Sequence, residues 1–149
     1  MCVIATPSGL KFVDADRLAG ITGFPVRSEY KQPDEPDVLP PADAFAVAPA
    51  TFNTVNKWAH GISDTLALGL LNEAVGAGRP IIAAPWPNNA LSRHPAFGRS
   101  VADLRAWGVT VLFDPAVLSS PDAPDMTEGT FPWTELCESL RETRAHLKS

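Results

Sequence analysis

The sequence lacks the features that mark nucleic-acid-binding, membrane-spanning and disulfide-rich proteins. Its 149 residues hold 12 Lys and Arg against 17 Asp and Glu, a net charge of −5. The basic residues form no block, which excludes a dedicated nucleic-acid surface. No apolar run is long enough to cross a bilayer, and the two cysteines, Cys2 and Cys137, lie too far apart to suggest a disulfide framework. We therefore expect a cytoplasmic protein without a nucleic-acid or membrane partner.

Proline and glycine are plentiful by contrast, with 15 and 10 residues, and they gather at the ends of apolar segments. With 45% apolar and 19% charged residues, the chain suits one domain with a substantial core. Apolar runs alternate with helical periodicity, which predicts an α/β fold: a three-layer, Rossmann-like (flavodoxin-like) parallel sheet with helices on both faces. The expected strands lie near residues 2–5, 26–30, 44–48, 81–84 and 109–113.

Capping and stop signals predict the helices. The candidate N-caps are Asp14 or Asp16 for a helix closed by Gly23, and Ser63 or Asp64 for a helix that runs to Val75. A further helix is expected over residues 98–107, and an apolar stripe from Trp133 to Leu147 predicts an amphipathic C-terminal helix. We therefore divide the chain into a domain of residues 1–131 and a C-terminal helix, residues 132–149, that packs on it.

The chain is organised around residues 44–78, where a short apolar strand ends at Pro49, which has no N–H for a sheet ladder. Three polar residues then lead into a helix whose apolar residues recur at helical spacing: Val55, Trp58, Ala59 and Ile62. Backbone donors at such a helix N-terminus suit a phosphate or another anion. The residues alone leave a second interpretation equally open, in which Thr51 or Asn53 only caps the helix.

In an open parallel sheet, ligands bind beyond the carboxyl ends of the strands. Three predicted turns lie at such ends, after Ala5, Ala48 and Ala84. Because these turns can converge on one site, they define one group of candidate ligand residues: Thr6, Ser8, Thr51, Asn53, Thr54 and Asn88.

The strand-to-helix turn also resembles a known family. Residues 48–54 read Ala-Pro-Ala-Thr-Phe-Asn-Thr, and residues 61–64 read Gly-Ile-Ser-Asp. They are similar to the Ala-Pro-(Ala/Leu)-(Ser/Thr)-Ala-Asn-Thr and Gly-Ile-Ala-Asp segments of the homo-oligomeric flavin-containing cysteine decarboxylases, which include phosphopantothenoylcysteine decarboxylase. The resemblance extends over about residues 2–128. It implies a flavoprotein that binds FMN between neighbouring subunits of a homo-oligomer, a trimer or a multiple of it, and that acts on a small molecule.

The resemblance also implies roles for individual residues. The implied FMN-contacting residues are Thr6, Ser8, Thr51, Phe52, Asn53, Thr54 and Pro87. Asn88 matches the asparagine that holds the substrate carboxylate, although a plain turn residue is an equal alternative for it. Two methionines of the family's substrate loop are replaced here, by Pro87 and Leu91. Leucine keeps the apolar volume, whereas proline removes a backbone donor and stiffens the loop.

Three features of the family are missing. Glu35 stands where the decarboxylases carry a catalytic histidine, and the histidines of this chain are expected at the surface: His60, His94 and His146. Residues 125–128 echo the end of a family flap, but the flap cysteine is absent, and Cys137 is expected to be a small core residue. The family's first strand and phosphate-binding turn have no counterpart. The chain is then truncated, begins at a start site assigned too late, or belongs to a branch that does without this unit. We expect an N-terminally incomplete domain, since losing a central strand exposes two sheet edges. Without the phosphate-binding turn, we expect these residues to bind FMN poorly.

These observations predict an FMN-binding flavoprotein of the cysteine-decarboxylase type, a decarboxylase-like lyase for a carboxylate-bearing thiol if it is active. Oxidative decarboxylation needs a base for the thiol proton and a flavin for the electrons, and the family's base is missing. The alternative is a non-catalytic partner or regulatory subunit that uses the same fold for assembly, with Phe52, Trp58 and Trp86 as interface anchors. A flavin prenyltransferase-like protein fits the turn over residues 48–54 less well.

Overall fold

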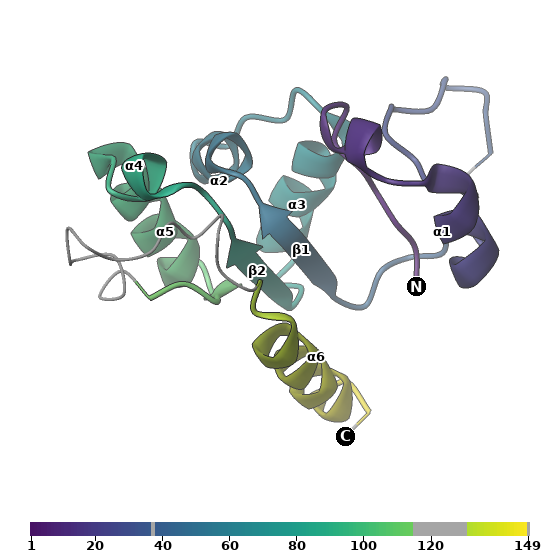
Figure 1. Ribbon diagram of the computed structural model, residues 1–149. Helices are drawn as coiled ribbons and strands as arrows, with labels where there is room; N and C mark the ends of the chain where they lie inside the picture. The colour runs from purple at the N-terminus through teal and green to yellow at the C-terminus, as the bar shows by residue number, and fades with distance from the viewer. Residues whose placement is uncertain (37, 115–130, 149) are drawn as a thin grey trace.

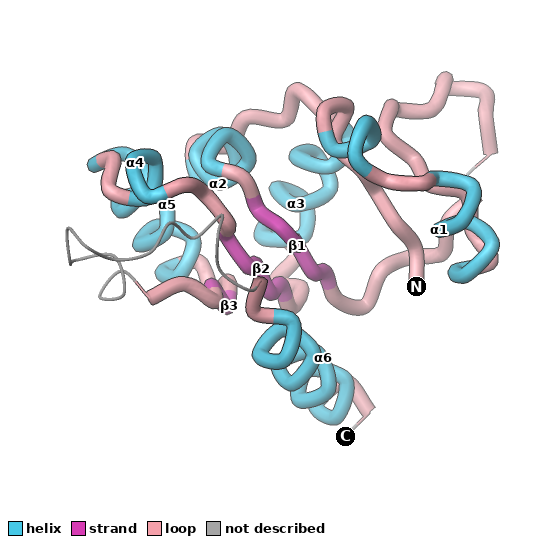
Figure 2. Tube along the Cα trace, in the orientation of Figure 1, coloured by secondary structure: helices cyan, strands magenta, loops and turns pink. Residues whose placement is uncertain are grey.

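The computed structural model describes residues 1–36, 38–114 and 131–148. Within these ranges, three parallel strands form a sheet in the order β1-β2-β3, with helices on both faces (Figure 1). The elements follow one another (Figure 2) as η1 (Gly9–Phe12), α1 (Ala15–Thr22), β1 (Phe45–Ala50), α2 (Phe52–Ala59), α3 (Leu66–Gly76), β2 (Ile81–Pro85), α4 (Asn89–Ser92), α5 (Pro95–Ala106), β3 (Thr110–Val111) and α6 (Trp133–His146). The predicted α/β fold with a parallel sheet is confirmed.

β2 is the central strand and is buried on both faces, as its unbroken apolar sequence predicts. Ile81 and Ala83 belong to the main core, to which α2, α3 and α5 contribute. Ile82 and Ala84 alternate with them and therefore turn to the opposite face. On that face α6 packs against β2, with Leu136 as its buried residue. Among the described residues, the main core therefore lies on one side of the sheet, and α6 covers β2 on the other.

β1 extends further than predicted, to Ala50, because a bulge accommodates Pro49. The first residues of β1 pair in register with β2, and the register shifts between Val47 and Ala50. Proline has no N–H to donate to the ladder, and the extra residue of a bulge needs none. The prediction that Pro49 ends the strand is therefore wrong. The carboxyl end of β1 leads directly to Thr51, the N-cap of α2.

The boundaries of α1 follow the sequence signals. The Asp14 side chain accepts a hydrogen bond from the backbone N–H of Arg17 at 3.0 Å, which satisfies one free donor of the first turn. Gly23 ends the helix with a φ of 75°, a left-handed conformation that glycine adopts without steric cost. Both predicted signals are confirmed, and Asp14 rather than Asp16 is the cap.

Three other helix boundaries differ from the prediction. α3 is capped by Thr65 and not by Ser63 or Asp64, because the side chain of Thr65 accepts from the N–H of Leu68 at 3.2 Å. α5 begins at Pro95, ahead of the predicted residue 98, since proline suits a first helical position. α2 ends at Ala59, so Ile62 lies outside the helix and is 42% exposed.

Residues 1–30, here called the N-terminal unit, contain less regular structure than predicted. The expected strands over residues 2–5 and 26–30 are reduced to one parallel bridge between Ile4 and Arg27. Ala5 N donates to Arg27 O at 2.8 Å, and Arg27 N donates to Val3 O at 3.2 Å. Neither η1 nor α1 contains a buried residue. The N-terminal unit therefore contributes little to the core.

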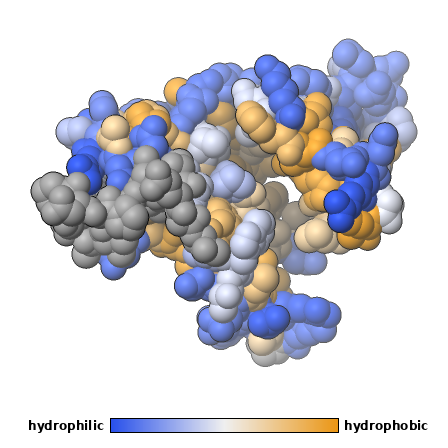
Figure 3. All heavy atoms as spheres, in the orientation of Figure 1, coloured by the Kyte–Doolittle hydropathy of each residue, from blue (hydrophilic) through white to orange (hydrophobic). Residues whose placement is uncertain are grey.

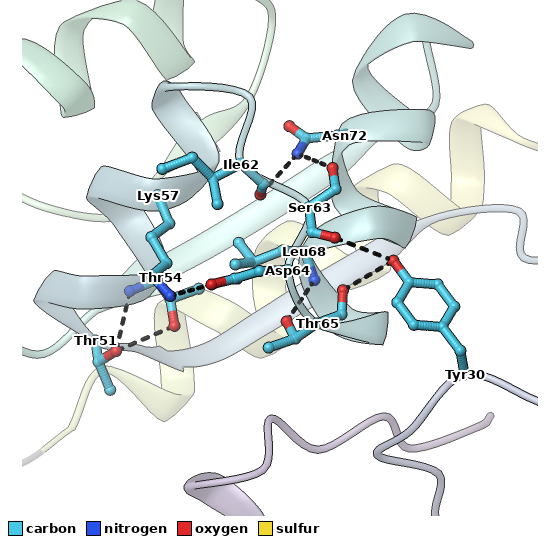
Figure 4. A network of polar contacts seen from close by, with 10 residues as sticks. All are labelled: Tyr30, Thr51, Thr54, Lys57, Ile62, Ser63, Asp64, Thr65, Leu68 and Asn72. Carbon is cyan, nitrogen blue, oxygen red and sulfur yellow. Dashed lines mark hydrogen bonds and ion pairs between the residues drawn. The ribbon is translucent and has the colours of Figure 1, made fainter.

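Tyr30 joins the N-terminal unit to the rest of the molecule. Its hydroxyl donates to Thr65 O at 3.1 Å and lies 3.5 Å from Ser63 O, at the start of α3 (Figure 4). Gly69 makes room for it, because a Cβ at that position would lie 2.1 Å from the Tyr30 hydroxyl oxygen. Tyr30, the last residue of the N-terminal unit, thus contacts Gly69 of α3.

No helix in the described part of the chain is long and apolar enough to cross a membrane. The same residues contain no group of three His, Cys, Asp or Glu side chains arranged to hold a metal ion. The segment over residues 125–128, compared above with a family flap, lies outside the described residues.

Candidate functional site

The candidate site lies at the carboxyl end of β1, where α2 begins. Thr51 is the N-cap of α2: its Oγ1 accepts from the N–H of Thr54 at 3.2 Å and donates to the Thr54 hydroxyl at 3.1 Å (Figure 4). Asn53 lies in the first turn of the helix, is exposed, and has no side-chain hydrogen-bond partner among the described residues. The capping role that either residue could have filled thus belongs to Thr51. The amide of Asn53 is left available to a ligand.

Phe52 forms the apolar side of this turn. It is half-buried and stacks on Phe97, with ring centroids 5.9 Å apart. The ring of His94 meets it edge-on at 5.6 Å. Trp58 lies deeper in the same helix and is completely buried, so it cannot serve as the interface anchor that one interpretation of the sequence required. Phe52 therefore helps to attach α2 to α5, and Trp58 belongs to the main core.

The second turn of the site follows Ala5. The Thr6 hydroxyl accepts from the N–H of Gly9 at 3.0 Å, and Thr6 O accepts from the N–H of Leu10 at 2.9 Å. A Cβ on Gly9 would lie 2.9 Å from the Thr6 hydroxyl, so glycine permits this tight turn. Ser8 is exposed and makes no cap hydrogen bond. Figure 1 places this turn and the end of β1 at the same edge of the molecule.

The third turn follows β2 and is tied to β1. Trp86 N donates to Ala50 O at 3.0 Å, and the next residue, Pro87, is buried. Asn88 caps α4, because its Oδ1 accepts from the N–H of Leu91 at 2.9 Å. The alternative prediction for Asn88, a plain turn residue, therefore agrees with its position at the start of α4. Its amide nitrogen has no partner in the described ranges and stays free to donate.

The three histidines are exposed, as predicted. Glu35 itself is exposed and accepts from the N–H of Gln32 at 3.0 Å. His60 and His146 lie on exposed helix ends, each with its Nδ1 2.8 Å from a backbone oxygen of its own helix. His94 accepts from the N–H of Ala96 through Nδ1 at 3.1 Å, which leaves the proton of the neutral ring on Nε2.

His94 is exposed, as predicted for a surface histidine, and it has a structural role that the sequence analysis did not predict. It caps α5 and contacts Phe52. The signal that could have revealed the cap is His94-Pro95 ahead of a periodic segment, since proline favours the first helical position. The prediction of a core position for Cys137 is wrong, because Cys137 is exposed on α6. Both Cys137 and the half-buried Cys2 are free thiols.

The segment of residues 61–64 holds the α2–α3 connection in shape. Lys57 pairs with Asp64 across it, and the Asn72 amide donates to Ile62 O at 3.1 Å and to the Ser63 hydroxyl at 2.8 Å (Figure 4). These bonds link the two helices that flank the site. In the described structure the segment has a structural role.

Several known proteins resemble this chain. The bifunctional coenzyme A biosynthesis protein CoaBC of Mycobacterium tuberculosis is 36% identical over 114 residues, which is 74% of this chain and 27% of that protein. Mouse phosphopantothenoylcysteine decarboxylase is 39% identical over 67 residues, or 45% of this chain and 32% of that protein. The chain thus spans about a quarter to a third of the length of these curated relatives.

The fold agrees with solved structures. The FMN-dependent cysteine decarboxylase TvaF from thioviridamide biosynthesis superposes with a TM-score of 0.70 and 26% sequence identity, over 97% of this chain and 79% of that one. The family model described as Flavoprotein matches residues 2–144, nearly the whole sequence. The chain therefore belongs to the flavoprotein family.

Proposed function

We propose that this chain binds FMN at the carboxyl edge of the sheet, with the flavin ring beside Asn53. One observation carries the proposal: Thr51 caps α2, so the exposed Asn53 amide keeps both a donor and an acceptor for a ligand. The edge of a flavin ring demands both kinds of group, which an asparagine side chain supplies. The N-terminus of α2 adds backbone donors that favour negative charge. The FMN dependence named for the solved cysteine decarboxylase supports this choice of ligand.

The neighbouring turns fit the same ligand. Ser8 offers an exposed hydroxyl, and the Thr6 hydroxyl, which accepts from Gly9, still has its own proton to donate. Thr54 and Pro87 are buried, so their contribution is to shape the floor of the site. The set therefore combines hydrogen-bonding groups at the rim with a rigid base.

We extend the proposal to decarboxylase-like chemistry on a small thiol that carries a carboxylate. Bound FMN would supply a two-electron acceptor for oxidative decarboxylation. Since the Asn88 carbonyl is committed to capping α4, its free amide N–H can hold the substrate carboxylate. Phe52 and Phe97 would exclude water from one side.

A second candidate function is an FMN-binding partner subunit without catalysis. The thiol proton needs an acceptor, and Glu35, at the family's histidine position, lies in an exposed loop. His94 cannot accept that proton in this geometry, because its Nδ1 lone pair is engaged by Ala96. Turnover of a small cysteine-derived carboxylic acid would separate the two functions, since a partner subunit would bind FMN and release no carbon dioxide.

We also propose that the chain forms a homo-oligomer, a trimer or a multiple of one. The N-terminal unit exposes large apolar side chains, among them Phe12 at 88% and Ile21 at 68% exposure. Such residues mark an interaction surface when they lie together. Sedimentation of the purified protein tests this, and a stable monomer at micromolar concentration would speak against it.

The FMN site is tested by an Asn53→Asp substitution followed by fluorescence titration. The change removes the amide donors and sets a negative charge beside the flavin, so FMN affinity should fall at least tenfold, about 1.4 kcal/mol. Stability should hold or rise slightly, because an acidic residue in a first helical turn is favourable. Asn88→Asp is the matched control: aspartate still caps α4, and FMN affinity should stay unchanged. Equal affinity of the Asn53→Asp and original proteins would refute the assigned position of the flavin.

A further inference from the structure

We propose that Ser100 and Asn56 are positioning residues, which hold Asn53 in place at the ligand site without contacting the ligand themselves. The inference rests on the proposed function, because Asn53 belongs to the turn that would bind FMN. It is carried by a chain of hydrogen bonds that runs from the interior of α5 to the first turn of α2.

The chain of hydrogen bonds begins at a serine that solvent does not reach. Ser100 lies on α5 and is completely buried, and its hydroxyl donates to Asn56 Oδ1 at 2.7 Å. Figure 3 shows mainly hydrophilic residues on the visible surface around α4, just ahead of α5. Such a surface is the usual place for serine. A hydroxyl buried between two helices instead needs a protein partner, and Asn56 provides it.

Asn56 extends the chain of hydrogen bonds to the first turn of α2. Its Nδ2 donates to Phe52 O at 3.0 Å. The orientation of this amide follows from its partners, because the Phe52 carbonyl can only accept and the NH₂ group must therefore face it. Oδ1 is then left for the Ser100 hydroxyl. Asn56 thus uses both ends of its amide, one within its own helix and one toward α5.

The chain of hydrogen bonds ends at the peptide bond between Phe52 and Asn53. A peptide unit is planar, so a hydrogen bond that fixes the Phe52 carbonyl also fixes the direction of the Asn53 N–H. That N–H has no partner among the residues that the structure describes, as is usual in a first helical turn. It belongs to the same residue whose exposed side chain we assign to FMN. The hydrogen bonds therefore act on the backbone of the residue at the site.

Aromatic contacts hold Phe52 from a second side. Its ring stacks on Phe97, and the ring of His94 meets it edge-on. His94, Phe97 and Ser100 follow one another at intervals of three residues and therefore share one face of α5. A ring can turn about its side-chain bonds without moving the peptide, whereas the Asn56 amide bonds to the peptide itself. The positioning role therefore belongs to Ser100 and Asn56.

The first measurement is hydrogen exchange, and it needs no FMN. The amide of Val55 donates to Thr51 O at 2.9 Å in the first turn, and the amide of Trp58 lies farther along α2. We expect Ser100→Ala to raise the exchange rate of Val55 relative to that of Trp58 by about fivefold or more. A general loss of stability would not raise this ratio. An unchanged ratio would overturn the proposal.

The second measurement is FMN affinity by fluorescence titration. Ser100→Ala leaves Asn56 Oδ1 without its partner, so FMN affinity should fall by about fivefold or more. Adding Asn56→Leu removes both polar groups, and the double variant should regain stability in urea. Its FMN affinity should nevertheless stay low, because the Phe52 carbonyl has still lost the side-chain amide. A purely structural role would restore stability and affinity together.

Val101→Ala is the matched control. It truncates a buried side chain next to Ser100 and should lower stability, while FMN affinity and the exchange ratio stay unchanged. Full FMN affinity in the double variant would overturn the proposal, as would an equal loss of affinity with Val101→Ala. Absence of FMN binding by the unmodified chain would instead refute the proposed function. The exchange ratio would then decide alone whether Ser100 and Asn56 hold the turn.

Discussion

The sheet with its helices and the N-terminal unit share one chain but are stabilised in different ways. The sheet region has a continuous core in which Trp58, Phe97 and Leu104 are completely buried. Within the described residues of the N-terminal unit, Ala5 is the one buried apolar residue, and α1 buries none. Hydrophobic burial is the main favourable term in folding. The two regions should therefore respond to mutation by different amounts and with different cooperativity.

The largest effect is expected for Trp58→Ala in the sheet region. Removing a completely buried indole should lower the free energy of unfolding by about 3–5 kcal/mol, measured by urea denaturation. The indole N–H has no hydrogen-bond partner among the residues that the structure describes, so Trp58→Phe deletes an unsatisfied buried donor and should cost less. Trp107→Ala, at a site 46% exposed, is the control and should stay within about 0.5 kcal/mol. Equal losses at the two tryptophans would contradict the contrast between core and surface.

A smaller, local effect is expected for Tyr30→Phe at the joint between the regions. Losing the hydroxyl bond to Thr65 should cost about 1 kcal/mol and loosen residues 1–30, while the urea transition of the sheet region stays in place. Limited proteolysis of residues 1–30 measures the loosening. Gly69→Ala should reproduce it, because the added Cβ would displace the Tyr30 hydroxyl. A shift of the whole urea transition would show instead that the two regions unfold together.

The smallest effect is expected for Lys57→Met beside the site. The Lys57 and Asp64 side chains are 31% and 49% exposed, so their ion pair should contribute about 0.5 kcal/mol or less. The contribution should vanish in about 1 M salt, where the Debye length is about 3 Å. A double-mutant cycle with Asp64→Asn isolates the pair from other losses. A coupling above about 1 kcal/mol that survives salt would assign this pair a larger structural role.

The same contrast explains which parts of the fold could be read from the sequence. β2 was predicted within one residue because its continuous apolar run is a local property. The Asp14 cap and the Gly23 stop of α1 are local too. The predicted strands at residues 2–5 and 26–30 form a single bridge, because a strand needs a neighbour that propensity cannot supply.

The sequence predicted where the candidate site lies better than it predicted the role of each residue there. The turn at Thr51 and Asn53 was found from composition, but which of them caps α2 depends on backbone geometry. Asn88 is likewise a cap, and a sequence pattern cannot distinguish a capping asparagine from a ligand-binding one. The exposure of Cys137 could not be foreseen, since it depends on which side of α6 meets the sheet.

The two regions that meet at Tyr30 differ in their intrinsic fluorescence. Tyr30 is the single tyrosine, and all four tryptophans, from Trp58 to Trp133, belong to the other region. A tyrosine near tryptophans loses its emission by energy transfer, so its fluorescence should brighten when the joint opens. Tryptophan emission should meanwhile report unfolding of the core through Trp58. Comparing excitation that selects tryptophan with excitation of both residue types can thus distinguish the two regions in the unmodified protein, without an added label.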